Sequence, residues 1–418
     1  MELLSPAGTL EKLHYAYTYG ADAAYIGMED FSLRTRAGNI NDDTIEELHR
    51  VKGNKRLYAA INSYLHEKDV GKLEERLDAI ARYPFEAFIV SDLGAARLLR
   101  NRFGDSRALH LSTQANCLNS AAVLTYKDLG FSRIILGRET PLDEIRRIKD
   151  AVPEMEIETF VHGAMCMAYS GRCFLSAFLT GRSANQGDCA HTCRWSYRLL
   201  EQKNVQGNST VLPAGELALE EESRPGEYFP VYEGDGYTTI LSSKDLCMID
   251  HLEKLKEAGV DSCKIEGRMK SLYYVATVTR AYRKALDALD GKQGSEDWKL
   301  FRDELFRVSH REFSTGFFFD NEAIANPTEV SYLRDYLLIG TVEQQTAPGQ
   351  YILKLKNKIE QNVPIEYIGP DTLGIEDTSF QLYDESGNEV EFANHQQTVI
   401  LKTHKSIGEG FIIRKKLK

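Results

Sequence analysis

The chain has 418 residues, of which 42% are hydrophobic and 27% are charged, and its formal net charge is −11. This composition predicts a globular protein that buries one large core and a second, smaller one, so two domains are expected. No run approaches 18 apolar residues and the start is not signal-like, which argues against a membrane span and predicts a cytoplasmic protein.

Short β-rich apolar runs alternate with amphipathic segments over the first part of the chain. The expected strands are Glu2–Ser5, Ala23–Met28, Arg56–Ser63, Ala87–Asp92, Ala108–Gln114, Arg133–Glu139, Glu156–Gly163 and Ser262–Arg268. Helical spacing is found in Thr9–Tyr19, Asp43–Val51, Leu73–Ala81, Ala95–Phe103, Ser120–Leu129 and Leu142–Ala151. Eight strands, most followed by a helix, predict an α/β fold, the TIM-type (β/α)8 barrel. An open doubly wound sheet is the alternative, disfavoured because no glycine-rich fingerprint follows the first strand.

The connection between the seventh and eighth expected strands is too long for a simple barrel. It runs from Ala164 to Asp261 and holds five of the seven cysteines. In a TIM barrel this connection leaves the carboxyl end of a strand, the face on which active sites form. We therefore expect a large cysteine-containing insertion at about 164–261 that lies over the barrel mouth.

The sequence pattern changes in the last part of the chain. A long helix is expected at Ser271–Leu289, followed by an irregular stretch to about Asp335, so the barrel domain is assigned to residues 1–335. Alternating runs separated by turn signals then follow at Tyr336–Val342, Gln350–Leu355, Pro364–Ile368, Phe380–Tyr383, Thr398–Lys402 and Gly410–Arg414. They predict a small all-β, barrel-like domain at 336–418.

Four cysteines, Cys166, Cys173, Cys189 and Cys193, lie close together in the insertion. Thiolates gathered in one segment suit an iron-sulfur cluster or zinc. Zinc fingers usually pair ligands two to four residues apart twice over, and only the last pair qualifies, so the spacing favours a cluster. Four buried free thiols are the alternative. An odd number of cysteines without a secretory signal argues against structural disulfides.

The remaining cysteines have a different setting. Cys263 lies inside an expected strand, and Cys247 follows the run Ser242–Asp245, which is typical of a helix cap. Both are therefore expected in the core, with Cys247 as a reserve metal ligand.

Polar side chains end or follow several expected strands, where a barrel points them at its substrate: His162, Gln114, Asn116, Arg138 and Glu139. His162 could bond to a cluster sulfide, transfer a proton or cap its strand. Along the eighth strand, Lys264, Glu266 and Arg268 alternate and so share one face. We expect them to pair inside the barrel, and a structural salt-bridged layer and a catalytic role both stay open.

Several longer strings are distinctive: FVHGAMCMAYSGRC, NQGDCAHTCRW, MELLSPAG, GADAAYIG, LSTQAN and KIEGR. With them the chain resembles the collagenase-like peptidase family over nearly its whole length. SLRTRAGN, SSKDL and the C-terminal β domain are most similar to the branch of that family that hydroxylates tRNA. The resemblance implies a 4Fe-4S cluster on Cys166, Cys173, Cys189 and Cys193, with Cys247 as the substitute for the last. For this branch it also implies prephenate-dependent conversion of the tRNA wobble uridine to 5-hydroxyuridine.

These implied substrates indicate further residues. Prephenate is a dicarboxylate, and guanidinium groups bind carboxylates bidentately, so Arg34, Arg36, Arg138 and Arg268 are the candidates to hold it. A splayed RNA base needs an aromatic surface near the mouth, and Tyr169 lies in the right segment. The expected partner is tRNA, which must be gripped beyond one base, so a protein partner or a second copy of the chain is compatible with the sequence.

Other functions stay open at this stage. The chain could be a peptidase, a hydroxylase of ribosomal RNA or of another substrate, or a non-catalytic metal- or RNA-binding module. A peptidase needs an activated Cys-His or Ser-His pair or a zinc motif, and none stands out by spacing. The net negative charge repels polyanions at long range, so RNA would have to meet a local basic patch.

Overall fold

The computed structural model describes the chain except residues 29–30, 33–40, 167, 187–188, 195–199, 203–208, 212–216, 221–227, 235–236, 240–242, 320–332 and 418. For 186, 194, 200–202, 209–211, 217–220, 228–234 and 237–239 only the backbone is described. Arg34 and Arg36 therefore lie outside the described residues. None of the helices in the described part of the chain is both long and apolar enough to cross a membrane.

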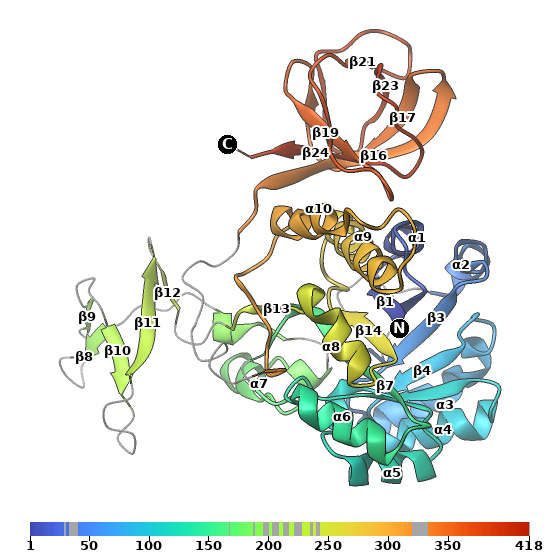
Figure 1. Ribbon diagram of the computed structural model, residues 1–418, viewed down its shortest axis with the longest axis vertical. Helices are drawn as coiled ribbons and strands as arrows, with labels where there is room; N and C mark the ends of the chain where they lie inside the picture. Colours follow the sequence, from blue (N-terminus) through green and yellow to red (C-terminus); the bar gives the residue numbers. More distant parts are fainter. Residues whose placement is uncertain are drawn as a thin grey trace.

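Eight parallel strands form a closed barrel (Figure 1). They are β1 (Glu2–Pro6), β2 (Ala23–Gly27), β3 (Arg56–Ile61), β4 (Ala87–Val90), β5 (Ala108–Leu111), β6 (Arg133–Ile135), β7 (Glu156–Ala164) and β14 (Ser262–Ile265). Each pairs with its neighbours in chain order, and β14 pairs with both β1 and β7, which closes the sheet. The predicted TIM-type barrel is confirmed, and the open-sheet alternative is wrong.

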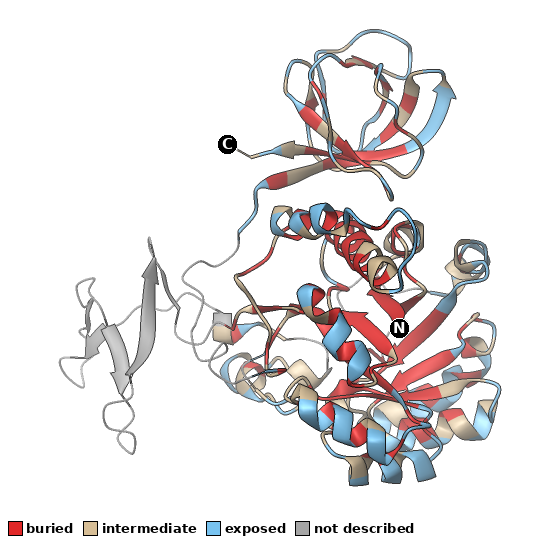
Figure 2. Ribbon diagram, in the orientation of Figure 1, coloured by how far each residue is buried: buried red, intermediate tan, exposed pale blue. Residues whose placement is uncertain are grey.

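Helices surround the barrel: α1 (Leu10–Thr18), α2 (Ile45–Lys52), α3 (Glu67–Ile80), α4 (Leu93–Phe103), α5 (Ser120–Asp128), α6 (Leu142–Ala151), α8 (Leu252–Glu257) and α9 (Leu272–Leu289), with the 3-10 turns η1 (Asp42–Thr44) and η2 (Thr113–Ala115). Several start at a capping side chain, because Thr9, Asp92 and Ser271 each accept a backbone N–H of the first turn. Figure 2 shows buried residues along the barrel strands and exposed ones on the outer helix faces.

The barrel interior holds charged as well as apolar side chains. Arg133 Nη1 lies 2.6 Å from Glu2 Oε1 and 3.0 Å from Glu158 Oε2. Lys264 Nζ lies 2.9 Å from Glu158 Oε1. All four residues are buried. Because an unpaired buried charge costs several kcal/mol, each of these groups depends on its partner.

The connection after β7 has two parts. The first contains α7 (Leu175–Thr180), η3 (Ala184–Gln186), η4 (Thr192–Arg194), β8 (Leu200–Gln202), β9 (Ser209–Val211), β10 (Leu217–Glu220), β11 (Tyr228–Gly234) and β12 (Tyr237–Thr239). The second returns to the barrel, because β13 (Asp245–Cys247) pairs antiparallel with the end of β7 and α8 packs against α6 and α9. The helix cap expected before Cys247 is therefore wrong, since the backbone there joins a strand; η5 (Ile249–His251) follows it.

The stretch after α9 is more ordered than expected. It contains α10 (Trp298–Asp303), η6 (Glu304–Arg307) and β15 (Phe313–Ser314), which pairs parallel with β13. Nearby, Arg311 Nη2 lies 2.7 Å from Asp245 Oδ1, and both residues are buried. This ion pair attaches the stretch to the strand that borders β7.

The C-terminal domain is antiparallel and all-β, as predicted. Its strands are β16 (Tyr336–Ala347), β17 (Gln350–Leu355), β18 (Ile359–Glu360), β19 (Ile365–Ile368), β20 (Ile375–Asp377), β21 (Gln381–Tyr383), β22 (Phe392–Ala393), β23 (Thr398–Lys402) and β24 (Ile412–Lys416). Seven of them form one sheet in the order β20-β19-β24-β16-β17-β23-β21. The sheet has its own apolar core, which includes Leu353, Tyr367 and Leu401.

Buried charges join this domain to the outer helices of the barrel (Figure 1). Arg414 of β24 donates to Glu304 Oε1 at 3.2 Å and to the Tyr273 hydroxyl at 2.8 Å. Arg280 of α9 donates to the carbonyl oxygen of Gly369 at 2.6 Å. Both arginines are almost fully buried, so the two domains are bound by polar contacts shielded from water.

Candidate functional site

A cavity of about 380 Å³ opens at the carboxyl ends of the barrel strands. Its floor includes Tyr25, Asn62 and Phe160 from the barrel. Its outer wall is the segment that follows β7, from Ala164 to Cys193. Barrel and insertion therefore build the cavity together, as the length of the connection predicted.

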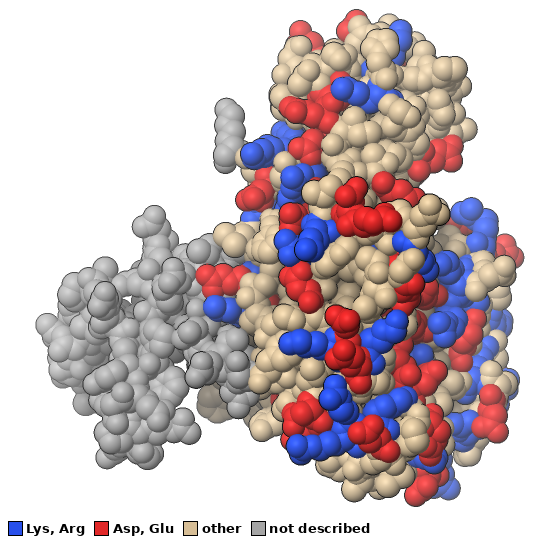
Figure 3. Space-filling model, in the orientation of Figure 1, with Lys and Arg blue, Asp and Glu red and all other residues tan. Residues whose placement is uncertain are grey.

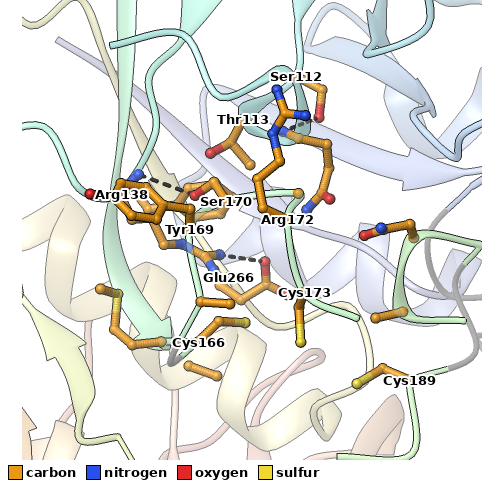
Figure 4. A pocket seen from close by; sticks show the side chains of 18 of the residues that line it. Ser112, Thr113, Arg138, Cys166, Tyr169, Ser170, Arg172, Cys173, Cys189 and Glu266 are labelled. Atoms are coloured by element: carbon orange, nitrogen blue, oxygen red, sulfur yellow. Dashed lines mark hydrogen bonds and ion pairs between the residues drawn. The ribbon is translucent and has the colours of Figure 1, made fainter. Parts of the chain in front are cut away.

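The four clustered cysteines all line this cavity. Figure 4 shows the sulfur atoms of Cys166, Cys173 and Cys189 along one side of it. No disulfide joins these four cysteines, and none of them is fully buried. Cys247 lies in β13 and is not among the lining residues; burial raises the pKa of its thiol to about 11. The cavity thus gathers the predicted ligands and leaves out the reserve one.

The donor set, four cysteine side chains that line one cavity, is of the kind that an iron-sulfur cluster takes. Within the described residues, no three His, Cys, Asp or Glu side chains are close enough to hold one metal ion. A cuboidal cluster is larger than an ion, so its four thiolates stand further apart. Backbone support is also present, since the N–H of His191 donates to Cys189 Sγ at 3.4 Å, the kind of bond that tunes a cluster.

Two strand ends meet across the mouth at an ion pair. Arg138 Nη2, after β6, lies 3.1 Å from Glu266 Oε2, after β14. The Arg138 guanidinium also lies 4.0 Å from the centre of the Phe160 ring. Two partners from different strands fix the orientation of the guanidinium. Among the residues that the structure describes, no other side chain binds it, so its other N–H groups can bind an anion.

Ser170 connects the insertion to the same region. The backbone N–H of Arg138 donates to Ser170 Oγ at 3.3 Å, and the N–H of Ser170 donates to Glu139 Oε1. The other carboxylate oxygen of Glu139, Oε2, is buried and has no hydrogen-bond partner in the described part of the chain. Glu139 therefore offers one free acceptor atom at the cavity.

Lys264 and Arg268 both line the cavity; Lys264 lies on β14, whereas Arg268 lies beyond its end at Ile265, so the eighth strand is shorter than expected. The ammonium of Lys264 is bound by Glu158 and lies 4.3 Å from the centre of the Tyr25 ring. Burial lowers the pKa of Lys264, and the nearby Glu158 carboxylate opposes that shift. The predicted pairing inside the barrel thus uses a partner on β7.

Gln114 lines the cavity beside a close contact between two loops. The Tyr64 hydroxyl lies 2.8 Å from the carbonyl oxygen of Gln114 and 3.2 Å from that of Gly171, and the Tyr64 N–H donates to the carbonyl oxygen of Asn185. Gly171 has φ of +73°, and a Cβ there would overlap the Gln114 carbonyl. Tyr64 thereby holds the cysteine segment against the barrel.

Two predicted residues lie away from the cavity. His162 is buried among the rings of Tyr274, Tyr282 and Phe313, and burial lowers its pKa to about 3. Asn116 has a left-handed backbone and is not among the lining residues. Tyr169 lines the mouth and is 62% exposed, which leaves its ring accessible.

Some lining residues were not predicted. Tyr64, which binds the cysteine segment without lining this cavity, was also not predicted; it follows the third strand, and the strand-end rule that selected Gln114 would have found it. Ser170 and Arg172 lie in the cysteine segment, where only the thiols carried a recognisable pattern.

The cavity also has a charge bias. Arg138, Arg172, Lys264 and Arg268 outnumber Glu139 and Glu266 among its lining side chains. By contrast, acidic and basic side chains are interspersed over the barrel face in Figure 3. An anionic ligand would therefore be attracted locally, at the mouth.

Comparison with known proteins gives matches along nearly the whole chain. Residues 8–326 match the family described as Peptidase family U32, and residues 334–414 match the Peptidase family U32 C-terminal domain. The tRNA hydroxylation protein P of Escherichia coli is 40% identical over 76% of this chain and 74% of its own length. The tRNA hydroxylation protein P1 of Bacillus subtilis is 36% identical over 99% of this chain and 94% of its own. A protein named collagenase from Porphyromonas gingivalis is 32% identical over 76% of this chain and 73% of its own.

Proposed function

We propose, on the premise that the chain belongs to peptidase family U32, that it is an RNA-modifying enzyme that hydroxylates tRNA. More specifically, it converts the wobble uridine to 5-hydroxyuridine with prephenate as co-substrate. The names of relatives that match most of the chain support RNA hydroxylation as the reaction class.

One observation carries the proposal: four cysteine side chains and an excess of cationic side chains share one cavity at the mouth of the barrel. The thiols suit an iron-sulfur cluster, and the cations suit the carboxylates of prephenate and the phosphates of RNA. A peptidase site needs neither four clustered thiols nor an excess of cationic side chains.

Cys166, Cys173, Cys189 and Cys193 would hold the cluster. When bound, a 4Fe-4S cluster supplies one-electron redox chemistry, at a potential set by its surroundings. Arg138 would bind a carboxylate of prephenate bidentately, in the orientation fixed by Glu266 and Phe160. Arg268 would contribute a second positive charge deeper in the cavity, and Lys264 a third.

Hydroxylation at C5 of uridine replaces a C–H bond with a C–OH bond, which is a two-electron oxidation. Prephenate, as co-substrate, would give up the hydroxyl group and accept the two electrons, and the C5 hydrogen would leave the base as a proton. We assign its acceptance to Glu139 Oε2, the buried oxygen that has no described hydrogen-bond partner. The exposed ring of Tyr169 would stack on the splayed base at the entrance.

The proposal is tested by measuring 5-hydroxyuridine in tRNA from a strain that lacks the gene. Mass spectrometry of tRNA nucleosides should show the loss of 5-hydroxyuridine and its return when the gene is restored. A gene with Cys173→Ser should not restore it. Unchanged 5-hydroxyuridine in the deletion strain would contradict the tRNA assignment, and a change confined to ribosomal RNA would redirect it to that substrate.

A peptidase is the second candidate, favoured by the collagenase relative and by one contact. Cys189 Sγ lies 4.0 Å from His191 Nδ1, a separation from which a Cys-His pair could act as nucleophile and base. Cleavage of gelatin by iron-free protein, abolished by Cys189→Ser, would support this function. A cluster on Cys189 would exclude it, because a ligated sulfur is not a free nucleophile.

A further inference from the structure

A second cavity, of about 410 Å³, lies beside the mouth and has no part in the proposed reaction. The loop Gly171–Phe174 is the wall between the two, because its residues line both. The far side of the second cavity is formed by Tyr64, Leu93 and Tyr126, from the loops and helices after β3, β4 and β5. A ligand that extends out of the mouth over this loop would enter it.

The second cavity contains exposed apolar and aromatic side chains beside its polar ones. Phe174 is 71% exposed and Leu93, at the start of α4, is 51% exposed. Exposed apolar side chains scattered singly over a surface need no explanation, but here two lie in one hollow with two tyrosines. A hollow of this composition suits a flat ring that packs against Phe174.

The same cavity contains a cation next to the aromatic ring. Arg172 is exposed, and in the part of the chain that the structure describes no carboxylate forms an ion pair with it. Asn185 adds an amide that can donate and accept hydrogen bonds. An aromatic face, an available guanidinium and an amide together match the base, the phosphate and the base edge of one nucleotide.

We propose that this second cavity is a subsite for the nucleotide next to the target uridine, with its base on Phe174 and its phosphate on Arg172. This inference rests on the proposed function, because it needs an RNA substrate whose target base enters the mouth. The two bases would be splayed on either side of the Gly171–Phe174 loop. Tyr64 fixes that loop to the barrel, so the spacing between the two base positions is set before RNA binds.

Binding of an anticodon stem-loop RNA to the full chain, purified without air, tests the subsite. Fluorescence anisotropy of the labelled RNA gives Kd for the wild type and for Phe174→Ala. The matched control is Phe178→Ala, because Phe178 is 77% exposed in the neighbouring α7 and lines neither cavity. Each protein is also measured with RNAs that carry an abasic site 5′ or 3′ of the wobble uridine. Thermal unfolding of each variant checks its fold.

We expect Phe174→Ala to raise Kd about tenfold and Phe178→Ala to leave it within about twofold. One of the two abasic RNAs should bind the wild type about tenfold more weakly, and Phe174→Ala should then add little, because the same stacking contact is already lost.

Equal Kd values for wild type and Phe174→Ala, or additive effects of Phe174→Ala and both abasic sites, would overturn the subsite. The wobble uridine would still be modified in that case, and the proposed function would stand. If the wild type neither binds the stem-loop nor restores 5-hydroxyuridine to the deletion strain, the proposed function and the subsite fall together. A collagen peptide that binds with dependence on Phe174, where the RNA does not, would assign the cavity to a protein substrate instead.

Discussion

Arg138 and Glu266 form an ion pair across the mouth of the barrel, with Nη2 and Oε2 3.1 Å apart. The pair joins the segments after β6 and β14, which flank β7 in the sheet. Phe160 of β7 lies beneath the guanidinium. Three adjacent strands thus determine where one positive charge is placed at the cavity.

Replacing Arg138 with alanine should therefore weaken binding of an anionic co-substrate. We expect Arg138→Ala to raise KM for prephenate about tenfold or more, because a charge-assisted hydrogen bond contributes about 1.5–3 kcal/mol. Steady-state hydroxylation of tRNA at varied prephenate measures this. Arg147→Ala, which removes an exposed arginine of α6, is the control and should leave KM unchanged. An unchanged KM for Arg138→Ala would place the carboxylates elsewhere.

The cysteine assignment can be tested by iron content. We expect most of the iron and sulfide to be lost from protein purified without air when any one of four cysteines is replaced with serine: Cys166, Cys173, Cys189 or Cys193. Cys117→Ser and Cys247→Ser are the controls, because burial raises the pKa of both thiols to about 11 and neither lines the cavity. If Cys247→Ser loses its iron and Cys193→Ser retains it, then Cys247 and not Cys193 is the fourth ligand.

Two glycines of the insertion allow the cost of backbone strain to be measured apart from the cost of steric overlap. Both have left-handed backbones, with φ of +73° at Gly171 and +70° at Gly181, but only Gly171 has neighbours that a methyl group would meet. Gly181→Ala should cost about 1–2 kcal/mol of unfolding free energy from strain alone. Gly171→Ala should cost about 2–4 kcal/mol, because it also overlaps the Gln114 carbonyl. Urea unfolding measures both, and equal values would show that the loop shifts at little cost.

The interface between the domains should depend on its buried charges. Arg414→Ala removes one of the three arginines that pair with the buried Glu304, the others being Arg280 and Arg307, and should destabilise the protein by about 1.5–3 kcal/mol. Lys284→Ala removes the pair with the exposed Asp371 and should cost less than about 1 kcal/mol. Limited proteolysis between the domains, in parallel with urea unfolding, measures the effect. Similar values for both variants would contradict this prediction.

The buried His162 should make stability depend on pH. Its pKa is about 3 in the folded chain because of burial, against the model-compound value of 6.5. The unfolded chain therefore takes up a proton near pH 6.5 that the folded chain does not. The stability that the neutral ring contributes is fully present above that pH and is lost as the pH falls toward 3, by at most about 1.4 kcal/mol per pH unit.

Substitution of His162 should flatten this dependence. We expect the unfolding free energy of His162→Phe to fall less steeply than that of the wild type between about pH 6 and 5. His395→Phe, at an exposed position of the C-terminal domain, should behave as the wild type. Urea titrations at several pH values give the slopes, and parallel slopes for all three proteins would show that His162 is not the titrating group.

Periodicity predicted most of the fold because each barrel strand is a short apolar run between helices. The start of every barrel strand agrees with the expected start, while several ends come earlier, as in β6, which stops at Ile135. The strand β13 was missed because it has three residues and is defined by pairing with the end of β7, a long-range contact that local sequence does not encode.

The candidate site was predicted in part, for similar reasons. Alternation placed Lys264 and Glu266 on one face, but their partners, Glu158 and Arg138, follow from the register between strands and loops. His162 was placed at the mouth by its position in the strand. Its ring lies among aromatic side chains instead, because α9 and β15 pack over it.

The links between the cysteine segment and the barrel bear on how the protein matures. Tyr64, Ser170 and Ser243 bind the backbone or side chains of this region through oxygen and nitrogen atoms alone. The scaffold around the thiols can thus form during folding, before any iron is delivered, unlike a zinc finger, which is unfolded without its metal. Under the proposed function, cluster insertion would then be a late step on an already shaped protein.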